Sequence, residues 1–409
     1  MAEKLKVKNG VRPRPKLHYF ILVFNILVII ALVTSAAGLL YVNGRISQRL
    51  VVTLDKTNKP NNFDEVSPEG SDWNLNTEGL DAQNFLLTGS DNGACTDPNS
   101  ATSGGIGDRT SLGERSDTIM IIRIDPSSNK AAILSFPRDL WVDIAGTTRQ
   151  NRINSAFQST DPNRLVATIQ ENFGVPIDHY VNINFCAFKE IVTAVDGVKV
   201  PFLYPTRDKK TGFNVTAPGC INFDGDIALA YVRSRSGYRY FDPTTQEWRE
   251  DPTGDLGRIK RQQDFLRRSI QRALDKGSKS LSVANELLNS ALKNVITDDQ
   301  LTPRNALTLA QAMRDLNTQE IGAYTIDSYP KRIGDMSVLI PSLKTDEMKN
   351  VLAIFQGKAP ITVQETSVRK NSAAKFELTA MRVAISKLSA LPDLLTSEGV
   401  VPPNDPACR

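Results

Sequence analysis

The chain has 409 residues, of which 40% are apolar, and its formal net charge is only +4. These values allow one large domain or two ordinary ones, and the balanced charge argues against a dedicated nucleic-acid binder. The chain contains two histidines, His18 and His179. A histidine-rich zinc site is therefore excluded, and a Ser-His-Asp site would have to use His179. Because His179 stands at the entrance to a predicted strand, a structural role is favoured for it.

The N-terminal segment predicts a membrane anchor. Residues 1–16 are basic, and the run from Tyr19 to Val42 carries no charge. Because this run is long enough to cross a bilayer as a helix, we expect one transmembrane anchor at residues 17–43. The basic flank predicts a cytoplasmic N-terminus and an extracellular remainder, at the cell membrane. The alternative is a cleaved signal peptide with TSAA as its cleavage site, although the apolar run continues past those small residues.

Four cysteines follow the predicted anchor: Cys95, Cys186, Cys220 and Cys408. None forms a C-x-x-C pair, which argues against a zinc ribbon or a thioredoxin-like site. An extracellular compartment permits disulfides, and four cysteines allow three complete pairings. Of these, we expect Cys186–Cys220, since both cysteines flank one predicted structural unit.

The rest of the chain predicts an α/β domain. Residues 44–80 are polar and contain Pro and Gly, which is typical of a stalk. Apolar runs of the strand type then recur at residues 84–89, 117–125, 130–137, 179–185 and 321–327. Helical patterns occupy residues 162–173, 188–197, 257–277, 282–295 and 303–316. Interspersed strands and helices predict a layered α-β-α domain with a central mixed sheet at residues 81–357, and a partly disordered extension at residues 358–409.

One predicted hairpin is informative about burial. The runs at residues 117–125 and 130–137 are nearly continuous in apolar residues and are joined by the short, turn-rich loop DPSSNK. Such runs are typical of strands that are buried on both faces. We therefore expect this hairpin to lie inside the sheet.

Arginines, aspartates and one glutamine recur beside the ends of the predicted strands and helices. They are Asp91, Arg115, Asp117, Arg138, Arg233, Arg235, Asp255, Arg258 and Gln262. Arginine is a planar fork that suits phosphate oxygens, and paired aspartates suit Mg²⁺, which keeps waters and takes phosphate oxygens as further ligands. Taken singly, each charge cluster is more often structural. Together, at the ends of elements in an α/β domain, they indicate phosphoryl transfer.

Several ordered motifs resemble a known family. In chain order they include NFLLTGSD, RSDTIMIIRIDPSSNKAAILSFPRDLWVDI, RINSAF, FDGDIALAYVRSR and GDLGRIKRQQDF, within residues 84–275. This order resembles the LytR-CpsA-Psr family. The resemblance implies a membrane-anchored, Mg²⁺-dependent phosphotransferase, with Mn²⁺ as an alternative metal. Such an enzyme attaches a glycopolymer from a polyprenyl-pyrophosphate carrier to peptidoglycan through a phosphodiester, and holds the prenyl chain in an apolar tunnel.

The resemblance also implies roles for the charged residues. Asp91 and Asp117 would hold the metal. The pyrophosphate would be bound by Arg115, Arg138, Arg233, Arg235, Arg258 and Gln262. The residues implied to take part in catalysis are Arg138, Arg233, Arg235 and Asp255. Two alternatives are a pyrophosphatase acting on the same lipids with water as acceptor, and a non-catalytic lipid-binding or regulatory protein of the envelope.

Two insertions depart from the usual pattern of this family. The segment at residues 92–114 is rich in Gly and Ser, and is interpreted either as a flap over the site or as an inert loop. The segment at residues 236–253 is rich in Tyr, Phe and Trp. Its aromatic side chains are expected either to stack on an acceptor sugar or to be buried against the domain.

Overall fold

The computed structural model describes residues 50–55, 79–91, 100, 102, 116–277, 295–362, 400–403, 405, 407 and 408. These residues all belong to one compact unit. The predicted basic tail, the predicted anchor and most of the predicted stalk lie outside them, as do Cys95, Arg115 and nearly all of the helix predicted at residues 282–295. Within the described ranges, no helix is both long and apolar enough to span a bilayer.

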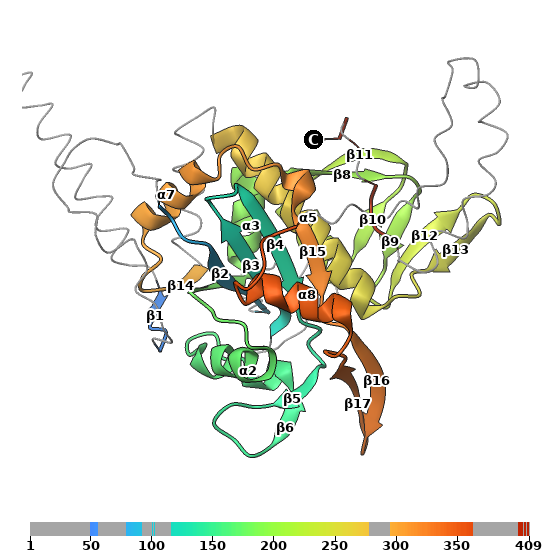
Figure 1. Cartoon of the computed structure of the whole chain (residues 1–409). Coiled ribbons are helices and arrows are strands. Elements are labelled where there is room, and N and C mark those ends of the chain that lie inside the picture. The colour runs from blue at the N-terminus through green and yellow to red at the C-terminus, as the bar shows by residue number, and fades with distance from the viewer. Residues whose placement is uncertain are drawn as a thin grey trace, which may run out of the picture. The chain divides into compact units, whose positions relative to one another are not determined.

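A seven-stranded mixed sheet forms the centre of the domain (Figure 1). In sheet order its strands are β1 (Val51–Val52), β14 (Val295–Asp298), β7 (His179–Asn184), β2 (Gln83–Ser90), β3 (Ser116–Asp125), β4 (Lys130–Ser135) and β15 (Gly322–Thr325). The pairs β1–β14, β7–β2 and β4–β15 are parallel, and the other neighbours are antiparallel. The predicted mixed sheet is confirmed. β1 lies inside the range predicted to be stalk, because its two residues find partners on β14.

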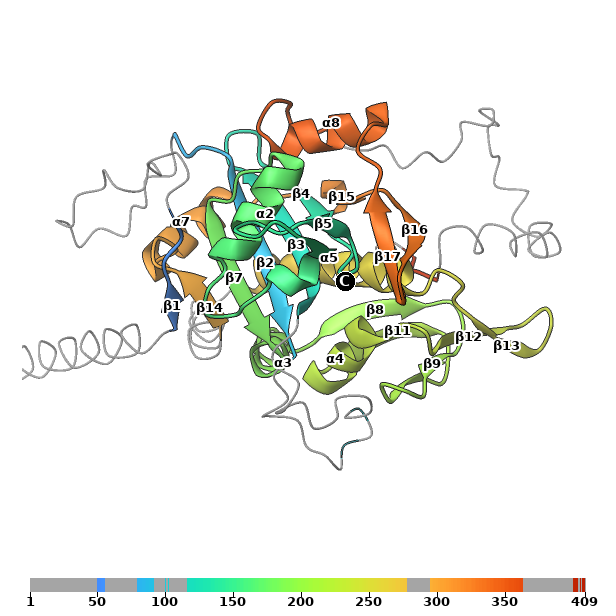
Figure 2. The same ribbon diagram turned by 90° about the horizontal axis from the view of Figure 1, so that it is seen from below.

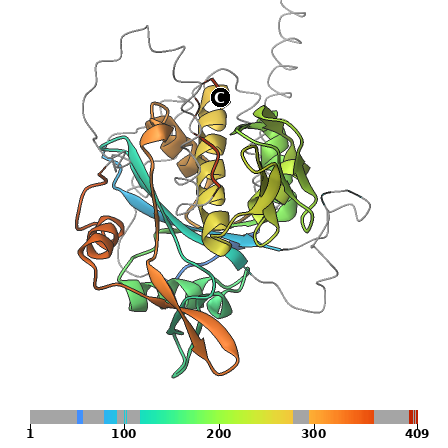
Figure 3. The same cartoon turned by 90° about the vertical axis from the view of Figure 1, so that its right-hand side faces the viewer.

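Strand β3 shows why the sheet is covered on both faces. Its side chains alternate, so that Ile119 and Ile121 belong to one hydrophobic core and Met120 belongs to another. The first core includes apolar residues of α2 (Asn163–Phe173) and α8 (Asp346–Phe355). The opposite face is covered by α5 (Asp255–Gly277) and α7 (Pro303–Ala312) (Figures 1 and 3). The expectation that the β3–β4 hairpin is buried on both faces is therefore confirmed.

A second group of elements packs on the other side of α5 (Figures 2 and 3). It contains α3 (Phe185–Ala194), α4 (Gly225–Arg233), the pair β8 (Val198–Phe202) and β11 (Gly219–Phe223), and a four-stranded sheet of β10 (Phe213–Val215), β9 (Thr206–Asp208), β12 (Tyr238–Asp242) and β13 (Glu247–Glu250). Its core is aromatic, and Phe265 of α5 belongs to it. Because Leu266 belongs to the core on the central sheet, α5 joins the two groups.

The remaining described elements are short and lie around the central sheet. They are β5 (Trp141–Asp143), β6 (Gln150–Arg152), η2 (Ile153–Ala156), η3 (Thr318–Glu320), β16 (Ser328–Ile333) and β17 (Met336–Pro341). The β5–β6 and β16–β17 pairs are antiparallel hairpins. An isolated bridge between Leu140 and Leu339 connects the loop after β4 to β17.

The C-terminal segment is held against the domain by a disulfide. Cys220 of β11 is bonded to Cys408, with their Cα atoms 5.5 Å apart, and Cys408 is buried. Arg268 of α5 also donates a hydrogen bond to the carbonyl of Pro403 at 2.9 Å. The expected Cys186–Cys220 bond is therefore wrong, although Cys186 is itself disulfide-bonded. The pairing could not be predicted because Cys408 reaches β11 only through the tertiary fold.

Candidate phosphate and lipid site

A cavity of about 470 Å³ lies between the central sheet and helices α3, α4 and α5. Its charged and amide lining includes Asp91, Asp117, Arg138, Asp208, Lys210, Arg233, Arg235, Arg258 and Gln262. Its apolar lining includes Leu87, Met120, Ile183, Phe185, Phe188, Ile191, Val192, Leu229, Val232, Phe265 and Leu266. Seven of the nine predicted site residues therefore share one cavity, while Asp255 lies next to it and Arg115 lies outside the described residues.

Along β2, β3 and α5, the charged or amide residues that line the cavity lie nearer one end of the element and the apolar ones lie further along it. On the antiparallel strands β2 and β3, Leu87 is paired with Met120, and the charged Asp91 and Asp117 stand nearer the ends of the same strands. Along α5, Leu266 comes one turn after Gln262. Each element thus passes from charged to apolar residues in the same cavity. Such a cavity can accommodate a ligand with a charged head group and an apolar chain.

Arg138 reaches the cavity because β4 ends just before it. The Phe136 amide still donates to the Ile119 carbonyl of β3 at 2.9 Å, and Pro137, which has no amide hydrogen to donate, follows it. The Arg138 guanidinium donates through Nη1 to Asp117 Oδ1, and its Nε lies 3.6 Å from Asp139 Oδ2. Burial lowers the pKa of Arg138, but the neighbouring carboxylates, Asp117 first, outweigh it and leave that pKa above its usual value. Arg138 is thus a fixed cation.

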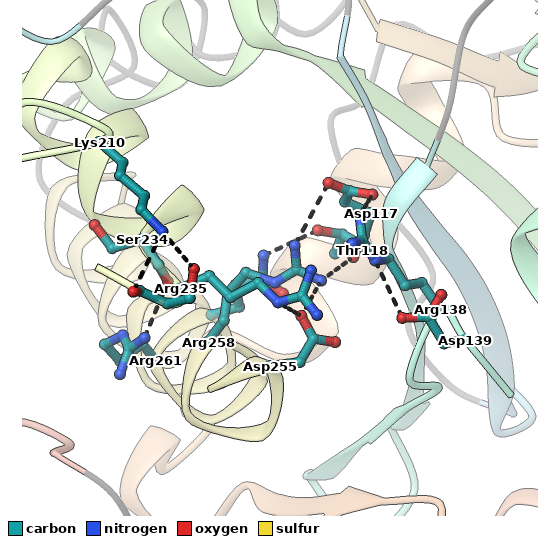
Figure 4. A network of polar contacts seen from close by, with 12 residues as sticks. Asp117, Thr118, Arg138, Asp139, Lys210, Ser234, Arg235, Asp255, Arg258 and Arg261 are labelled. Carbon is teal, nitrogen blue, oxygen red and sulfur yellow. Dashed lines mark hydrogen bonds and ion pairs between the residues drawn. The ribbon is translucent and has the colours of Figure 1, made fainter. Parts of the chain in front are cut away.

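Arg258 connects β3 with α5. Its side chain is only 4% exposed, and its Nη2 donates to the backbone carbonyl of Asp117 at 2.9 Å. The same Nη2 lies 3.0 Å from Asp255 Oδ1, and Nη1 lies 3.5 Å from Asp117 Oδ2. Burial lowers the pKa of Arg258, and Asp255 and Asp117 counteract that effect. Figure 4 shows Arg258 lying between these two aspartates.

Asp255 extends the network to Arg235. Its Oδ1 lies 3.0 Å from Arg258 Nη2 and 3.0 Å from Arg235 Nε, so one carboxylate forms ion pairs with two guanidinium groups (Figure 4). Arg138, Asp117, Arg258, Asp255 and Arg235 therefore form one chain of alternating charges. This arrangement keeps three cations close together in a partly buried site, which is a setting that suits a polyanion.

Arg233 and Gln262 join α4 to the rest of the site. Helix α4 begins at a regular cap, where Asp224 Oδ1 accepts from the Ile227 amide at 2.8 Å, and it ends at Arg233. The Arg233 guanidinium lies 5.2 Å from the centre of the Phe185 ring. Gln262 Nε2 donates both to Thr118 Oγ1 and to the Val232 carbonyl, each at 3.0 Å. Gln262 thus fixes the end of α4 against β3.

Some residues at the site were not predicted. Lys210 lines the cavity and donates to Ser236 Oγ at 2.9 Å, but a lysine in a turn carries no distinctive sequence signal. Arg261 and Asp251 form a fully buried pair that does not line the cavity. Arg261 stands in the same RIKRQQ motif as Arg258, so the motif could have drawn attention to it, but its burial depends on the fold.

The aromatic insertion at residues 236–253 forms the β12–β13 hairpin. Tyr238 and Tyr240 are buried, as expected if the insertion packs against the domain. Phe241 and Trp248 are only half-buried and pack against each other, and Arg207 lies 3.8 Å from the Trp248 ring centre. Acceptor binding by these two rings stays a prediction. Nearly all of the other insertion, residues 92–114, lies outside the described residues.

His179 has a structural environment. It is fully buried, its Nδ1 lies 3.2 Å from both carboxylate oxygens of Asp298, and it is absent from the cavity lining. Asp298 also accepts from the Tyr180 amide at 3.0 Å, which ties β7 to β14. In the described part of the chain, no cluster of three or more His, Cys, Asp or Glu side chains could hold a metal ion. The carboxylates that line the cavity are those of Asp91, Asp117 and Asp208.

Comparison with known proteins identifies the family. The LytR_cpsA_psr family model matches residues 40–354. The chain is 33% identical over 202 residues to a Bacillus cereus protein named polyisoprenyl-teichoic acid–peptidoglycan teichoic acid transferase TagU. That match covers 48% of this chain and 60% of the relative, so the chain spans less than two thirds of the relative's length.

Solved structures share the fold. One is a protein of Enterococcus faecalis described as a transcriptional regulator, with 26% identity, a TM-score of 0.51, and coverage of 68% of this chain and 88% of that one. Another is a LytR-Csp2A-Psr enzyme from Actinomyces oris, with 20% identity, a TM-score of 0.53, and coverage of 75% and 96%. The family match over residues 40–354 confirms the resemblance of the sequence motifs, and the chain belongs to the LytR-CpsA-Psr family.

Proposed function

We propose that this protein is a phosphotransferase that attaches a glycopolymer from a polyprenyl-pyrophosphate carrier to peptidoglycan. The observation that carries the proposal is the cavity, in which a chain of three arginines adjoins an apolar lining of Leu, Ile, Val, Met and Phe side chains. Few ligands need both a dense set of cations and an extended apolar surface. The name of the Bacillus cereus relative, a polyisoprenyl-teichoic acid–peptidoglycan transferase, supports the same substrate class.

The charge network suits the chemistry of such a transfer. An acceptor hydroxyl oxygen attacks the sugar-linked phosphorus, a new P–O bond forms, and the bond to the bridging oxygen of the pyrophosphate breaks. The hydroxyl proton passes to solvent water, and the polyprenyl phosphate leaves. Negative charge grows on the bridging oxygen, where Arg138, Arg235 and Arg258 would stabilise it. Asp117 and Asp255 hold these arginines in place before the substrate arrives.

Reconstitution tests the proposal directly. The full chain is placed in vesicles with a polyprenyl-pyrophosphate-linked glycan, Mg²⁺ and peptidoglycan, and the products are separated. Glycan joined to peptidoglycan through a phosphodiester is the expected result. Release of phosphorylated glycan into solution would instead indicate a pyrophosphatase, and binding of the lipid without turnover would indicate a non-catalytic lipid-binding protein.

The apolar lining provides a prediction about the lipid chain. Leu266→Glu places a carboxylate among apolar side chains of the cavity. We expect the affinity for geranylgeranyl pyrophosphate to fall by about tenfold or more, because burying a charge against an apolar chain costs free energy. Inorganic pyrophosphate should bind as in the wild type. Leu256→Glu is the matched control, since Leu256 lies on the same helix, is 46% exposed and does not line the cavity. Equal affinities of the two variants for the lipid would contradict this role of the cavity.

Mg²⁺ is the proposed metal, with Mn²⁺ as the alternative. The residues fit such an ion, because Asp91 and Asp117 line the same cavity and Mg²⁺ is commonly held by one or two carboxylates together with waters and phosphate oxygens. When bound, the ion would neutralise charge on the pyrophosphate. Register supports this pairing of carboxylates, since Ser90 and Ser116 are partners on β2 and β3.

Asp91→Ala tests the metal role. The variant should lose most of the stimulation of transfer by added Mg²⁺, because one of two proposed carboxylate ligands is gone. Transfer is measured against Mg²⁺ concentration, with Asp335→Ala as a control in which an exposed carboxylate that does not line the cavity is removed. An unchanged Mg²⁺ response in Asp91→Ala would exclude Asp91 as a ligand.

The proposal places the domain outside the cell membrane, anchored by residues 17–43 with the N-terminus in the cytoplasm. The uncharged run and its basic flank support this orientation. The disulfide bonding of Cys186 and Cys220 suits an oxidising compartment. A protease added to intact spheroplasts should digest the domain, and protection of the domain would contradict this location.

A further inference from the structure

We propose that the buried pair Asp251–Arg261 is a positioning device that sets the two arginines at the end of α4, Arg233 and Arg235, in place for the pyrophosphate. Neither Asp251 nor Arg261 lines the cavity. The inference depends on the proposed function for the identity of the ligand. The positioning itself depends only on contacts within the fold.

The two donor ends of Arg261 serve different groups. Both side chains of the pair are 0% exposed, and Arg261 Nη1 lies 2.5 Å from Asp251 Oδ2. Arg261 Nη2 donates to the backbone carbonyl of Ser234 at 2.9 Å, while the guanidinium carbon lies 3.9 Å from the centre of the Tyr238 ring. The planar guanidinium group holds its N–H donors in fixed directions, so one side chain can bind a carboxylate and a carbonyl at the same time.

Ser234 is the residue between the two site arginines. Its hydroxyl lies 2.9 Å from Thr211 Oγ1 and 2.9 Å from the Ala230 carbonyl, and the Arg235 amide lies 3.3 Å from Asp208 Oδ2. With its carbonyl held by Arg261, the turn that follows α4 is fixed through backbone and side chain alike (Figure 4). The directions in which Arg233 and Arg235 leave the backbone therefore depend on the buried pair.

Asp251 is itself held in place from several sides. It accepts from Thr253 Oγ1 at 2.5 Å and from the Thr253 amide at 3.0 Å, and its own amide donates to the Tyr238 carbonyl at 2.9 Å. Gly257 on α5 makes room for it, since a Cβ there would lie 2.5 Å from Asp251 Oδ2 and 2.3 Å from Thr253 Oγ1. Arg261 therefore contacts both ends of the segment that carries the β12–β13 hairpin. It binds Ser234 just before this segment and Asp251 near the end of it.

Stability alone is a poor explanation of this pair. Removing two charges from water is costly, and apolar side chains of similar volume often stabilise a fold as well or better. One of the two terminal nitrogens of Arg261, Nη2, donates to a backbone carbonyl that is flanked by the two site arginines. A role in setting the geometry of that segment accounts for this contact, whereas filling the core does not.

The test compares two largely buried charge pairs that each include an arginine of α5. Asp251→Asn with Arg261→Gln keeps a neutral polar pair but is too short at position 261 to reach Ser234. The control is Asp264→Asn with Arg268→Gln, which removes the pair between Asp264 Oδ2 and Arg268 Nε, 2.8 Å apart and also largely buried. Both double variants are made in the full chain. Thermal unfolding then shows whether their losses of stability are similar.

Two readouts follow, and the first needs no ligand. Hydrogen exchange at the amides of residues 234 and 235 should be faster in the Asp251/Arg261 variant than in the control. Affinity for geranylgeranyl pyrophosphate should fall by about tenfold in the same variant alone, because a misplaced Arg233 or Arg235 loses a hydrogen bond to the charged ligand, and such a bond is worth about this much. Equal exchange at these two amides in both variants would overturn the inference. If the wild type fails to bind the probe, the proposed function is contradicted, and the exchange result still decides the positioning role.

Discussion

Replacing Arg138 with alanine is expected to lower the rate of glycan transfer by about a thousandfold, which is the lower end of the effect of an arginine that stabilises a phosphoryl-transfer transition state. Arg138 lines the cavity, is 23% exposed, and has its guanidinium held by Asp117 on one side and Asp139 on the other. Its loss removes one of three linked cations without opening the hydrophobic core. Initial rates in the reconstituted transfer assay, together with the unfolding temperature, measure the effect.

Arg152→Ala is the control for this experiment. Arg152 lies 3.2 Å from Asp139 Oδ1, so it shares a carboxylate partner with Arg138, but it does not line the cavity. Its removal should change the transfer rate by less than about threefold, as for an ion pair near the surface and outside the cavity. A near-normal rate in Arg138→Ala, with the fold intact, would remove Arg138 from the catalytic site.

Replacing Asp117 with asparagine is expected to separate binding from turnover. In the absence of substrate, Asp117 is the carboxylate partner of both Arg138 and Arg258, so it competes with a pyrophosphate for the same cations. Without its charge, affinity for pyrophosphate in the absence of metal should rise by about tenfold, as for a lost repulsion between like charges a few ångströms apart in a partly screened site. The rate of transfer should fall by about a hundredfold or more, because the arginines lose their orientation and the proposed metal loses a ligand.

Asp139→Asn distinguishes this effect from a general loss of negative charge. Asp139 lies beside Arg138 as well, with its carboxylate 21% exposed, but it is absent from the cavity lining. It should alter metal-free affinity and transfer only slightly. Titration of both variants with inorganic pyrophosphate, with and without Mg²⁺, provides the comparison. Weaker metal-free binding by Asp117→Asn would show that Asp117 does not compete with the ligand.

Much of the central sheet could be predicted because its strands have strong local patterns. β3 and β4 are continuous apolar runs joined by a short turn, and both were predicted within two residues of their observed ends. The helical patterns at residues 162–173 and 257–277 likewise lie within two residues of the observed ends of α2 and α5. These elements depend on contacts that are close in sequence or on the period of apolar residues, which a single sequence displays.

Other parts of the fold depend on distant partners. β1 is a strand of two residues that exists because β14, far along the chain, accepts it in parallel. The strands of the four-stranded sheet around β9 are three to five residues long, too short to show a clear alternation. The cysteine pairing was mistaken for the same reason, since nothing local to Cys220 indicates Cys408.

Which residues belong to the candidate site could be predicted from the sequence, but which of them form ion pairs with one another could not. Aspartates and arginines at the ends of elements were visible, and seven of the nine predicted residues meet in one cavity. The sharing of Asp255 by Arg235 and Arg258 was not visible, because it depends on how the loop before α5 approaches the end of α4. Arg261 was missed because Arg258 and Gln262 of the same motif line the cavity, whereas Arg261 pairs with Asp251.

The disulfide between Cys220 and Cys408 makes the C-terminal segment inseparable from the domain in a covalent sense. The two cysteines are 188 positions apart and enclose α4, the β12–β13 hairpin and α5 within one closed ring of chain. A single cut anywhere between residues 363 and 399 would therefore release no fragment until the protein is reduced. The same ring means that changes in the length of that segment cost little, because the entropy of closing a loop grows only slowly with its length.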